Sequence, residues 1–353
     1  MKLFTPGPIM MAPETIIEAG RQSQYFRTPE FSKMLSECAE MLGDILNAPD
    51  YAKMIFLTGS GTAAMEATVT NLFTEQDKII IINGGSFGKR FKQICEIHNL
   101  NFVSIDLEWN ETFSTEILTN YQESGFTGML INMCETSTGQ KYPMEAIAEF
   151  CKTNNICLVI DAISSFLCDS VRMKPLGAAA VIISSQKGLG LQPGMSFVAL
   201  TEEAYRGRCE RNKVKSLYFR FTDYVSDIGR GQTPYTPAVS IINQLHCKLN
   251  KLVSEGVWAQ IYHIATLASY FRAKLTEKTN FIIPTYPLSN CLTPVYCEKN
   301  NAMEIVEILK KRHDVYVTPC GGSTASFLFR VAHMSRQITK DDVDVLIELL
   351  RNY

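Results

Sequence analysis

The sequence has little net charge, no long apolar run and no secretory leader pattern, and each lack excludes a class of protein. Its 353 residues include 34 Lys and Arg against 36 Asp and Glu, for a formal net charge of −2. Nucleic-acid binders usually carry a basic excess, so no nucleic-acid partner is indicated. No apolar run reaches the ~18–20 residues that span a bilayer, so we expect no membrane contact. The start, from Met1 to Pro8, has one lysine and then Pro and Gly, which predicts no signal peptide.

The cysteines are scattered along the chain and form no recognisable pattern. None of the 11 stands in a C-x-x-C pair, and no Cys/His group has the spacing of zinc ligands. Several, such as Cys157, lie inside apolar runs. We therefore expect buried, reduced thiols in a cytoplasmic protein, and no metal site.

What the sequence does contain is the pattern of an α/β protein. Hydrophobic residues make up 46% and charged residues 20%, which is typical of a globular chain with a large core. Between residues 54 and 200, apolar runs alternate with helical patterns, as expected for βαβ units and a mainly parallel sheet covered on both faces. The predicted strands are Met54–Thr58, Lys78–Asn83, Gly128–Cys134, Ile156–Ile160, Ala179–Ser184 and Ser196–Thr201. The predicted helices between them are Thr62–Phe73, Gly88–His98 and Met144–Thr153.

After Ala204 the alternation ends and a smaller α+β domain is predicted. Residues 205–235 show no clear periodicity, whereas a helical pattern runs from Pro237 to Thr279 with a break at Glu255-Gly256. Shorter strands and helices complete the chain: strands near Asn290–Tyr296, Asp314–Thr318 and Phe327–Ala332, and helices at Ala302–His313 and Lys340–Arg351.

Lys187 is the first candidate for chemistry. It lies in Ser185-Gln186-Lys187-Gly188, just past a predicted strand, where α/β proteins place functional groups. A partly desolvated lysine has a lowered pKa and can form a Schiff base. The alternative is an ordinary solvated lysine in a turn.

Asp161 ends the preceding strand after four apolar residues. A carboxylate there needs a partner, because burying a charge alone is costly. A protonated ring nitrogen of a cofactor would serve, and so would the N-terminus of a following helix that Asp161 caps.

The segment Gly59-Ser60-Gly61-Thr62 lies between a strand and a helix. Backbone N–H groups and hydroxyls at a helix N-terminus can cradle a phosphate. Neither a P-loop nor a G-x-G-x-x-G pattern is present, so nucleotide hydrolysis and dinucleotide binding lack support. The other interpretation is a turn that is tightened by glycine.

Two further side chains stand out. Phe87, in Gly85-Ser86-Phe87-Gly88, follows a strand, where its ring can stack on a planar cofactor or pack in a core. Arg330 lies within the apolar run Phe327–Ala332 and needs an anionic partner, which can be a structural carboxylate or a substrate carboxylate.

Together these residues resemble one family, the pyridoxal-phosphate-dependent class V aminotransferases of fold type I. The order and spacing of several motifs carry the resemblance over nearly the whole chain: Thr5-Pro6-Gly7-Pro8, Arg27-Thr28-Pro29-Glu30-Phe31, Gly59-Ser60-Gly61-Thr62, Asn83-Gly84-Gly85-Ser86-Phe87-Gly88, Glu135-Thr136-Ser137-Thr138-Gly139, Asp161-Ala162-Ile163-Ser164-Ser165, Ser185-Gln186-Lys187, Gly231-Gln232-Thr233-Pro234-Tyr235-Thr236-Pro237 and Phe329-Arg330. The resemblance implies a large domain, with a mainly parallel seven-stranded sheet flanked by helices, and a smaller C-terminal α+β domain. It implies an N-terminal arm over residues 1–20 that contributes to the dimer or the small domain. It also implies a large pyridoxal-phosphate domain over 21–240, and a long linking helix with the small C-terminal domain over 241–353.

The resemblance also implies a role for each candidate residue. Lys187 would carry the cofactor and move the substrate proton, and Asp161 would keep the ring nitrogen protonated so that the ring accepts electrons. Arg330 would bind the substrate carboxylate. The remaining cofactor contacts that it implies are Ser60, Gly61, Thr62 and Gln186 at the phosphate, Phe87 and Ile163 on the two ring faces, Ser137 near the phenolic oxygen, and Tyr235 and Thr236 at the phosphate of the other subunit. Homodimers with shared active sites are thus implied.

Two subgroups of the family fit the sequence. Ser185-Gln186-Lys187 and the segment around Tyr235 resemble alanine–glyoxylate and serine–pyruvate transaminases, which work by a ping-pong aldimine/ketimine mechanism. Glu135–Gly139 also resembles 2-aminoethylphosphonate–pyruvate transaminases, and we favour the first subgroup. The amino donor, the acceptor and whether the pocket takes a phosphonate stay open.

Two less favoured interpretations and one departure from the family complete the prediction. One is a cysteine desulfurase or lyase, which would need a mobile thiol, and Cys320 is the candidate for it. The other is a catalytically silent binding protein, and the presence of Lys187, Asp161 and Arg330 together argues against it. The sequence departs from the family at Ala332-His333, and we expect His333 at the surface rather than in a specificity pocket.

Overall fold

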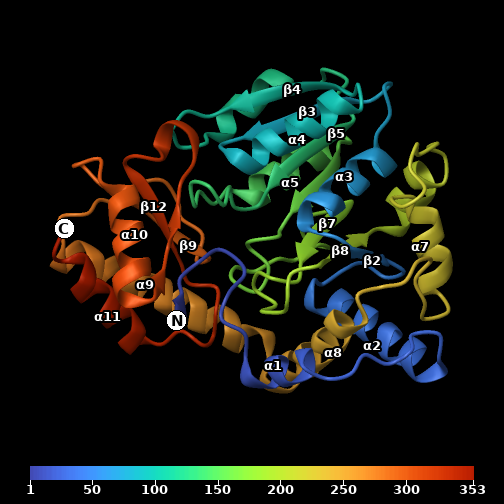
Figure 1. Cartoon of the computed structure of the whole chain (residues 1–353). Coiled ribbons are helices and arrows are strands. Elements are labelled where there is room, and N and C mark those ends of the chain that lie inside the picture. The colour runs from blue at the N-terminus through green and yellow to red at the C-terminus, as the bar shows by residue number, and fades with distance from the viewer.

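The computed structural model describes residues 1–353 except the side chain of Ser323. A seven-stranded sheet forms the centre of a large α/β unit, with a smaller unit of helices and short strands beside it (Figure 1). The strand order is β2-β8-β7-β6-β5-β3-β4, and β8 runs antiparallel to both neighbours while the other pairs are parallel. The strands are β2 (Lys53–Thr58), β3 (Lys78–Asn83), β4 (Asn101–Asp106), β5 (Gly128–Asn132), β6 (Cys157–Asp161), β7 (Ala180–Ser184) and β8 (Met195–Leu200). The predicted fold class is therefore confirmed.

Strand β4 is the member of this sheet that the sequence analysis missed. It lies at the sheet edge, beside β3, and only Ile105 among its six residues is buried. An edge strand covered on one side lacks the continuous apolar run by which the buried strands were found. The other strands predicted for this sheet are present, with ends that differ by up to two residues, whereas the single strand predicted near Asp314–Thr318 is two short strands that belong to different sheets.

Helices cover both faces of the large sheet because neighbouring strand residues point to opposite sides. Ile80 and Ile82 of β3 join one core cluster, and Ile79 and Ile81 join the other. The first cluster includes residues of α2 (Pro29–Ile45), α5 (Met144–Thr153) and α8 (Val239–Glu255). The second includes residues of α3 (Gly61–Leu72), α4 (Ser86–Ile97) and α7 (Phe221–Ile228). The result is the three-layer body of Figure 1.

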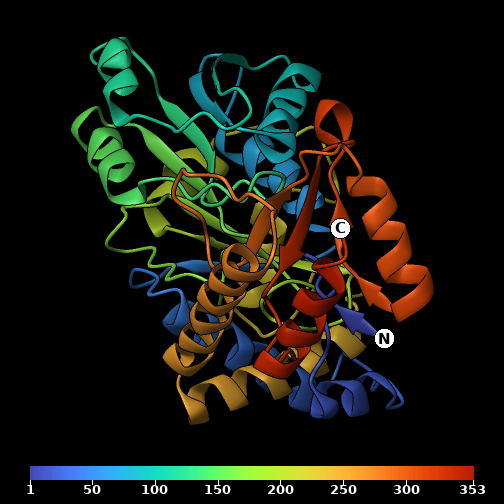
Figure 2. The same ribbon diagram turned by 90° about the vertical axis from the view of Figure 1, so that its left-hand side faces the viewer.

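The smaller unit has its own core, formed by helices and short strands of the C-terminal part. Its antiparallel sheet has the order β11-β12-β9, from β9 (Leu292–Tyr296), β11 (Thr318–Pro319) and β12 (Leu328–Ala332). The helices α9 (Val257–Lys278), α10 (Ala302–His313) and α11 (Lys340–Leu350) pack on it. Figure 2 shows both chain termini in this unit.

The N-terminal segment crosses from the small unit to the large one. Strand β1 (Lys2–Leu3) pairs in parallel with β10 (Val315–Tyr316), and α1 (Pro13–Ala19) packs against α8. The predicted break between α8 and α9 is present at Gly256, whose φ of 85° suits glycine. The domain boundaries at residues 20 and 240 stay a prediction. No helix of the described residues has the length and apolarity that a membrane span requires.

Candidate active site

The candidate residues gather at one edge of the large sheet. Strands β5, β6 and β7 are parallel neighbours, so their carboxyl ends meet at the same edge. Asn132 ends β5, Asp161 ends β6, and Ser184 ends β7 three residues before Lys187. Three segments that are well separated in sequence thus converge beside the lysine.

Lys187 is buried in the turn after β7. Only 8% of the residue is exposed. Burial lowers the pKa of Lys187 to about 8, and the charge of Arg330 also lowers it, against an opposing effect of Asp161. The amine is therefore partly neutral near physiological pH, which is the state that a nucleophile or a proton carrier needs.

The N-terminal arm lies directly on this lysine. Lys187 Nζ donates a hydrogen bond to the backbone carbonyl of Pro6. Gly7 has a φ of +116°, and a Cβ atom there would lie 2.8 Å from Lys187 Cδ. Both conformation and space therefore require glycine. The sequence analysis assigned the arm to the dimer or the small domain and missed this contact within one chain.

Asp161 is a buried carboxylate with two donors. Its Oδ2 accepts from Asn132 Nδ2 at 2.6 Å, and its Oδ1 accepts from the backbone N–H of Ile163 at 2.8 Å. Burial raises the pKa of Asp161 to about 6, although both hydrogen bonds oppose the shift. Asn132 was missed by the sequence analysis, although its place at the end of a buried strand was a usable signal.

The turn Ser60-Gly61-Thr62 opens α3. Ser60 is the N-cap residue, yet its side chain makes no hydrogen bond to the helix. A Cβ atom on Gly61 would lie 2.5 Å from Ile163 Cδ1, so the glycine brings the turn against Ile163. Arg90, which the sequence analysis did not single out, donates to Thr62 Oγ1 at 3.1 Å. The turn thus offers a hydroxyl, helix N–H groups and a nearby guanidinium.

Phe87 and Ser137 both lie at the start of α4. Phe87 lies in the first turn of α4, and the guanidinium of Arg90 lies 4.6 Å from the centre of its ring. Ser137 Oγ accepts from the backbone N–H of Ser86 at 2.9 Å and donates to Glu135 Oε1 at 2.5 Å. The expected stacking of Phe87 and contact of Ser137 with a cofactor stay predictions.

Two of the expected phosphate contacts, Gln186 and Tyr235, have partners within the chain. Gln186 Oε1 accepts from Ser184 Oγ. Tyr235 stacks on Tyr218 with ring centres 4.9 Å apart, and its hydroxyl donates to the carbonyl of Leu217. Thr236 is exposed. The described contacts do not bring Tyr235 or Thr236 to Lys187, so their role in a second subunit stays a prediction.

Arg330 reaches toward the sheet edge from β12 of the small unit. Its two Nη atoms donate to the carbonyls of Thr136 and Pro319, at 3.0 and 2.9 Å. Its Nε is buried without a hydrogen-bond partner among the described atoms. No salt bridge joins Arg330 to any described carboxylate, so the structural ion pair considered from the sequence is not formed. A guanidinium that has no described carboxylate partner, and whose charge acts on Lys187, is suited to binding an anion.

Comparison with known proteins decides the family. The family described as Aminotransferase class-V matches residues 16–340. The chain belongs to the class V aminotransferases. This aminotransferase is 25% identical to the L-aspartate–glyoxylate aminotransferase of Paracoccus denitrificans, over 94% of the chain and 86% of the relative. It is 29% identical to the 2-aminoethylphosphonate–pyruvate transaminase of Pseudomonas fluorescens, over 72% of the chain and 71% of the relative.

A solved structure shares the fold over almost the full length. The alanine–glyoxylate aminotransferase of Nostoc sp. superposes with a TM-score of 0.93 at 24% identity, covering 99% of this chain and 94% of that one. Class V aminotransferases use pyridoxal 5′-phosphate.

The residues of the aminotransferase fit this cofactor. Lys187 is buried with a lowered pKa, and Asp161 is a carboxylate whose burial is not compensated by a cation within salt-bridge distance among the described residues. Ser60 Oγ is not used by its own helix. Each of these groups has a matching partner on the cofactor: an aldehyde, a ring nitrogen and a phosphate.

Two residues around the site correct or qualify the sequence analysis. The expectation that His333 lies at the surface is wrong, because its side chain is fully buried. Its Nε2 lies 2.9 Å from Thr293 Oγ1 and its ring packs on Phe271, so it fills the small unit's core. Cys320 is also buried, and burial raises the pKa of its thiol. A buried thiol with a raised pKa does not favour desulfurase chemistry.

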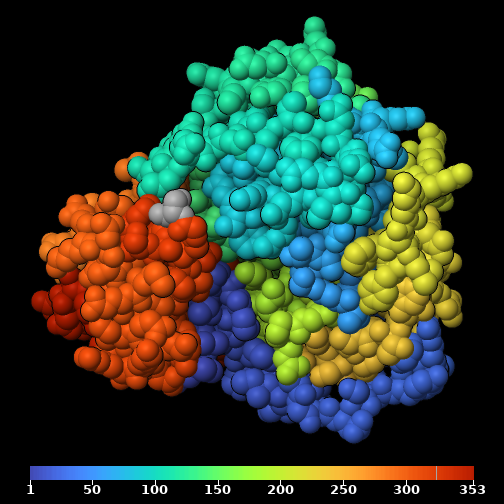
Figure 3. Space-filling model, turned by 45° about the horizontal axis from the view of Figure 1, so that its top comes forward, coloured from blue at the N-terminus to red at the C-terminus, as the bar shows by residue number. Residues whose placement is uncertain are grey.

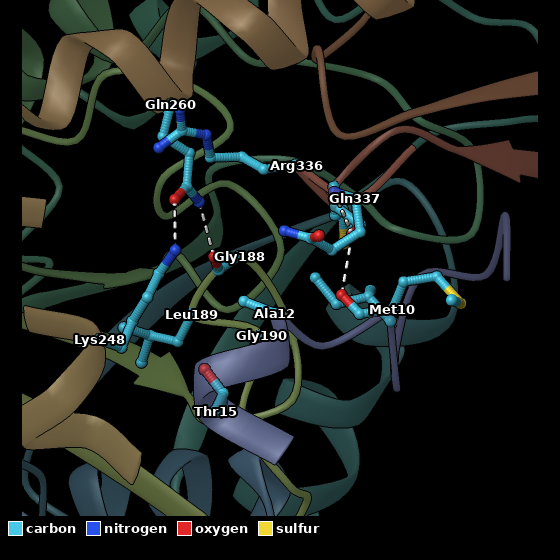
Figure 4. Close-up of a pocket in the computed structure, with 13 residues that line it drawn as sticks. Met10, Ala12, Thr15, Gly188, Leu189, Gly190, Lys248, Gln260, Arg336 and Gln337 are labelled. Atoms are coloured by element: carbon cyan, nitrogen blue, oxygen red, sulfur yellow. Dashed lines mark hydrogen bonds between the residues drawn. The ribbon is translucent and has the colours of Figure 1, made fainter. Parts of the chain in front are cut away.

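A small cavity lies behind the lysine turn of the aminotransferase. Its volume is about 20 Å³, and its lining includes Gly188, Lys248 and Gln260 (Figure 4). Lys248 Nζ donates to Gln260 Oε1 at 2.7 Å, and Gln260 Nε2 donates to the carbonyl of Gly188 at 2.7 Å. Burial lowers the pKa of Lys248 to about 8, with further lowering by Arg336. The molecule therefore has a second lysine with a lowered pKa, and its hydrogen bonds lead through Gln260 to the residue that follows Lys187.

Proposed function

We propose that the aminotransferase moves an amino group from a small amino acid, such as alanine or serine, to a 2-oxo acid such as glyoxylate or pyruvate. The observation that carries this proposal is the guanidinium of Arg330, which has no carboxylate partner among the described residues and whose charge acts on the buried amine of Lys187. One cation near one amine suits substrates with a single carboxylate next to the reacting carbon. Both the donor and the acceptor of such a reaction have this group.

Each residue then has a defined task. When bound, pyridoxal phosphate supplies an aldehyde that takes up the amino group and a ring that accepts electrons. Lys187, with a pKa of about 8, would carry the proton from the substrate Cα to the cofactor carbon bound to the transferred nitrogen, and would carry it in the opposite direction when the acceptor takes up the amino group. Asp161, supported by Asn132, holds a proton at the ring nitrogen. Arg330 orients the carboxylate of each substrate in turn.

Proton transfer also needs Lys187 to be confined. Pro6 accepts a hydrogen bond from Nζ, and Gly7 packs on the lysine stem. This contact limits the positions that the amine can take and keeps water from one side of it. The N-terminal arm thus contributes to the site as well as the strand ends.

The assembly and location in the proposal follow from the family. We place Tyr235 and Thr236 at the phosphate of a second subunit, so that the enzyme is a homodimer with shared sites. Thr236 is exposed and available for such a contact. We place the enzyme in the cytoplasm, where its 11 cysteines would stay reduced, as they are in the structure.

A second candidate is transamination between 2-aminoethylphosphonate and pyruvate. The specific support for it is Glu135–Gly139 together with the 29% identical relative that bears this name. This donor carries a phosphonate instead of a carboxylate, so the same site would have to hold two different anions. The following experiment separates the two candidates.

The test is an absorbance titration of the purified holoenzyme with single amino donors. A donor that reacts should lower the band of the lysine-bound cofactor near ~410–420 nm and raise one near ~330 nm. Alanine or serine should produce this change, and Lys187→Ala should not. A response to 2-aminoethylphosphonate alone would select the second candidate. A visible band that no donor changes would reject transamination of these donors.

A further inference from the structure

Glu135 is a fully buried carboxylate that the proposed reaction does not use. None of its surface is exposed, and its side chain lies between β5 and α4. Its Oε2 accepts from the backbone N–H groups of Phe87 at 3.2 Å and Gly88 at 2.9 Å. Its Oε1 accepts from the N–H of Ser137 at 3.1 Å and the hydroxyl of Ser137 at 2.5 Å. No salt bridge joins it to a described cationic side chain, so its charge rests on these donors.

The carboxylate replaces a cap that α4 lacks. The N-cap residue of α4 is Gly85, which has no side chain to accept from the first N–H groups. Glu135 provides that acceptor from a different segment, at the end of the helix where a negative charge is favourable. A Cβ atom on Gly85 would lie 2.9 Å from Glu135 Cδ and 2.1 Å from Ser137 Oγ. Glycine at this position therefore allows the carboxylate to approach.

Three of these four hydrogen bonds involve two residues that the proposed function places at the cofactor. One is Phe87, whose backbone is held directly. The other is Ser137, whose only hydroxyl proton is donated to Glu135. A serine hydroxyl has one proton, so toward any further group Ser137 can only accept. Glu135 thus determines where the Phe87 ring lies and which hydrogen-bonding role remains for Ser137.

We propose that Glu135 is a positioning residue of the cofactor site, which fixes Phe87 and Ser137 through one buried carboxylate. The proposal rests on the proposed function for the placement of these two residues at the cofactor. It differs from an ordinary helix cap, which stabilises a helix and has no effect on ligand affinity. The aminotransferase offers such a cap for comparison in Thr339, which forms a capping box with Asp342 at the start of α11.

The test measures the dissociation constant of pyridoxal phosphate and the melting temperature of the cofactor-free protein. The variants are Glu135→Gln, Glu135→Ala, Phe87→Ala and the double variant E135Q/F87A, with Thr339→Ala as the matched cap control. Glu135→Gln keeps the volume and removes part of the acceptor capacity, so it remains informative if Glu135→Ala fails to fold. The absorbance maximum of the bound cofactor is a third readout, which a remote cap does not change.

Glu135→Gln should weaken cofactor binding about tenfold, a coupling within the usual range for residues in contact. In the Phe87→Ala background the same change should weaken binding less than about threefold, because the ring that Glu135 positions is absent. Thr339→Ala should lower the melting temperature and leave the dissociation constant unchanged. The absorbance maximum should shift in Glu135→Gln and stay in place in Thr339→Ala.

Two results would overturn the proposal. Glu135 variants that lose only thermal stability, like Thr339→Ala, would reduce Glu135 to a helix cap. An equal loss of affinity with and without Phe87 would show that Glu135 does not act through that ring. A wild-type protein that binds the cofactor but transaminates no donor would reject the proposed function and leave the affinity comparison valid. A wild-type protein that binds no cofactor would reject both.

Discussion

Two lysines with nearly the same acidity lie on opposite sides of one turn. Burial lowers the pKa of both Lys187 and Lys248 to about 8. Lys187 lies among Asp161, Arg330 and the strand ends, whereas Lys248 faces a cavity of about 20 Å³ and the amide of Gln260 (Figure 4). A cavity of that size holds about one water molecule. A perturbed pKa alone therefore does not identify a reactive lysine; the groups and the space around the amine do.

The two lysines lie in different places relative to the two units of the chain. The small C-terminal unit and the large unit meet along a hollowed boundary in Figure 3. Arg330 of β12 links the two units, because it donates to the carbonyl of Thr136 after β5, and the turn that carries Lys187 follows β7 of the large unit. Lys248 instead lies on α8, behind the turn, where Gln260 of α9 accepts a hydrogen bond from it. The comparison can be tested by substituting residues around Lys187 and residues around Lys248 separately.

The largest expected effect is the loss of turnover in Lys187→Ala. Removing the proton-transfer residue should lower kcat by about 10²–10⁴-fold or more. Lys248→Met is the matched control, since it removes an amine of similar pKa and should change kcat less than about threefold. Steady-state kinetics with the best donor checks both. An equal loss in both variants would make the cavity around Lys248 part of the reacting site.

The next largest effect is expected on substrate binding, where Arg330 is compared with Arg336. Arg330→Ala should weaken binding of both carboxylate substrates by ~2–4 kcal/mol, as expected when a buried charge loses its partner. Arg336→Ala, next to the Lys248 cavity, breaks a surface pair with Glu255 and should leave KM unchanged. KM values for donor and acceptor are the measurement, and an unchanged KM in Arg330→Ala would remove its assigned role.

Asp161→Asn should change stability and cofactor affinity in opposite directions. The pKa of this carboxyl is raised from 3.8 to about 6, so its contribution to the stability of the cofactor-free protein is present below pH 3.8 and lost as the pH rises through 6. The difference corresponds to at most ~3 kcal/mol. The amide that replaces the carboxyl does not titrate, and Asn132, whose Oδ1 has no described partner, can turn its own amide to accept from it.

The readouts for this variant are urea unfolding of the cofactor-free protein between pH 4 and 8 and titration with pyridoxal phosphate. Above pH 6 the variant should be more stable than the wild type, and it should bind the cofactor more weakly. A variant with unchanged cofactor affinity would contradict a bond between Asp161 and the ring nitrogen.

The smallest effect concerns Lys248 itself. Its pKa is lowered from 10.5 to about 8, so its full contribution to stability is present above pH 10.5 and is lost as the pH falls through 8. Stability of the wild type should therefore rise between pH 8 and 10.5 by ~1–2 kcal/mol, less than the full shift because the side chain is partly exposed. In Lys248→Met this rise should be smaller by that amount. The measurement is the urea concentration at the midpoint of unfolding for both proteins at pH 8 and 10.5. An equal rise in both proteins would contradict the prediction.

The sequence by itself determined the elements and the main reactive groups. Continuous apolar runs placed β3 and β6 within one residue, and the 3.6-residue period placed α5 and α10 with their observed bounds. These signals are local. A strand that is covered on both faces must consist almost entirely of apolar residues, so its own sequence reveals it. The order of motifs was enough to identify the family to which Lys187, Asp161 and Arg330 point.

Only the tertiary structure decided how polar groups meet across long sequence distances. The bond of Asn132 to Asp161 depends on the register of β5 beside β6, and the bonds of Glu135 to Phe87 depend on how the chain after β5 passes the start of α4. His333 was assigned to the surface because a histidine is usually at least partly exposed, and the fold buries it beside Phe271. The sequence pointed to Lys187 and gave no sign of the lowered pKa of Lys248, because what surrounds each amine is set by the packing of segments that are distant in the chain.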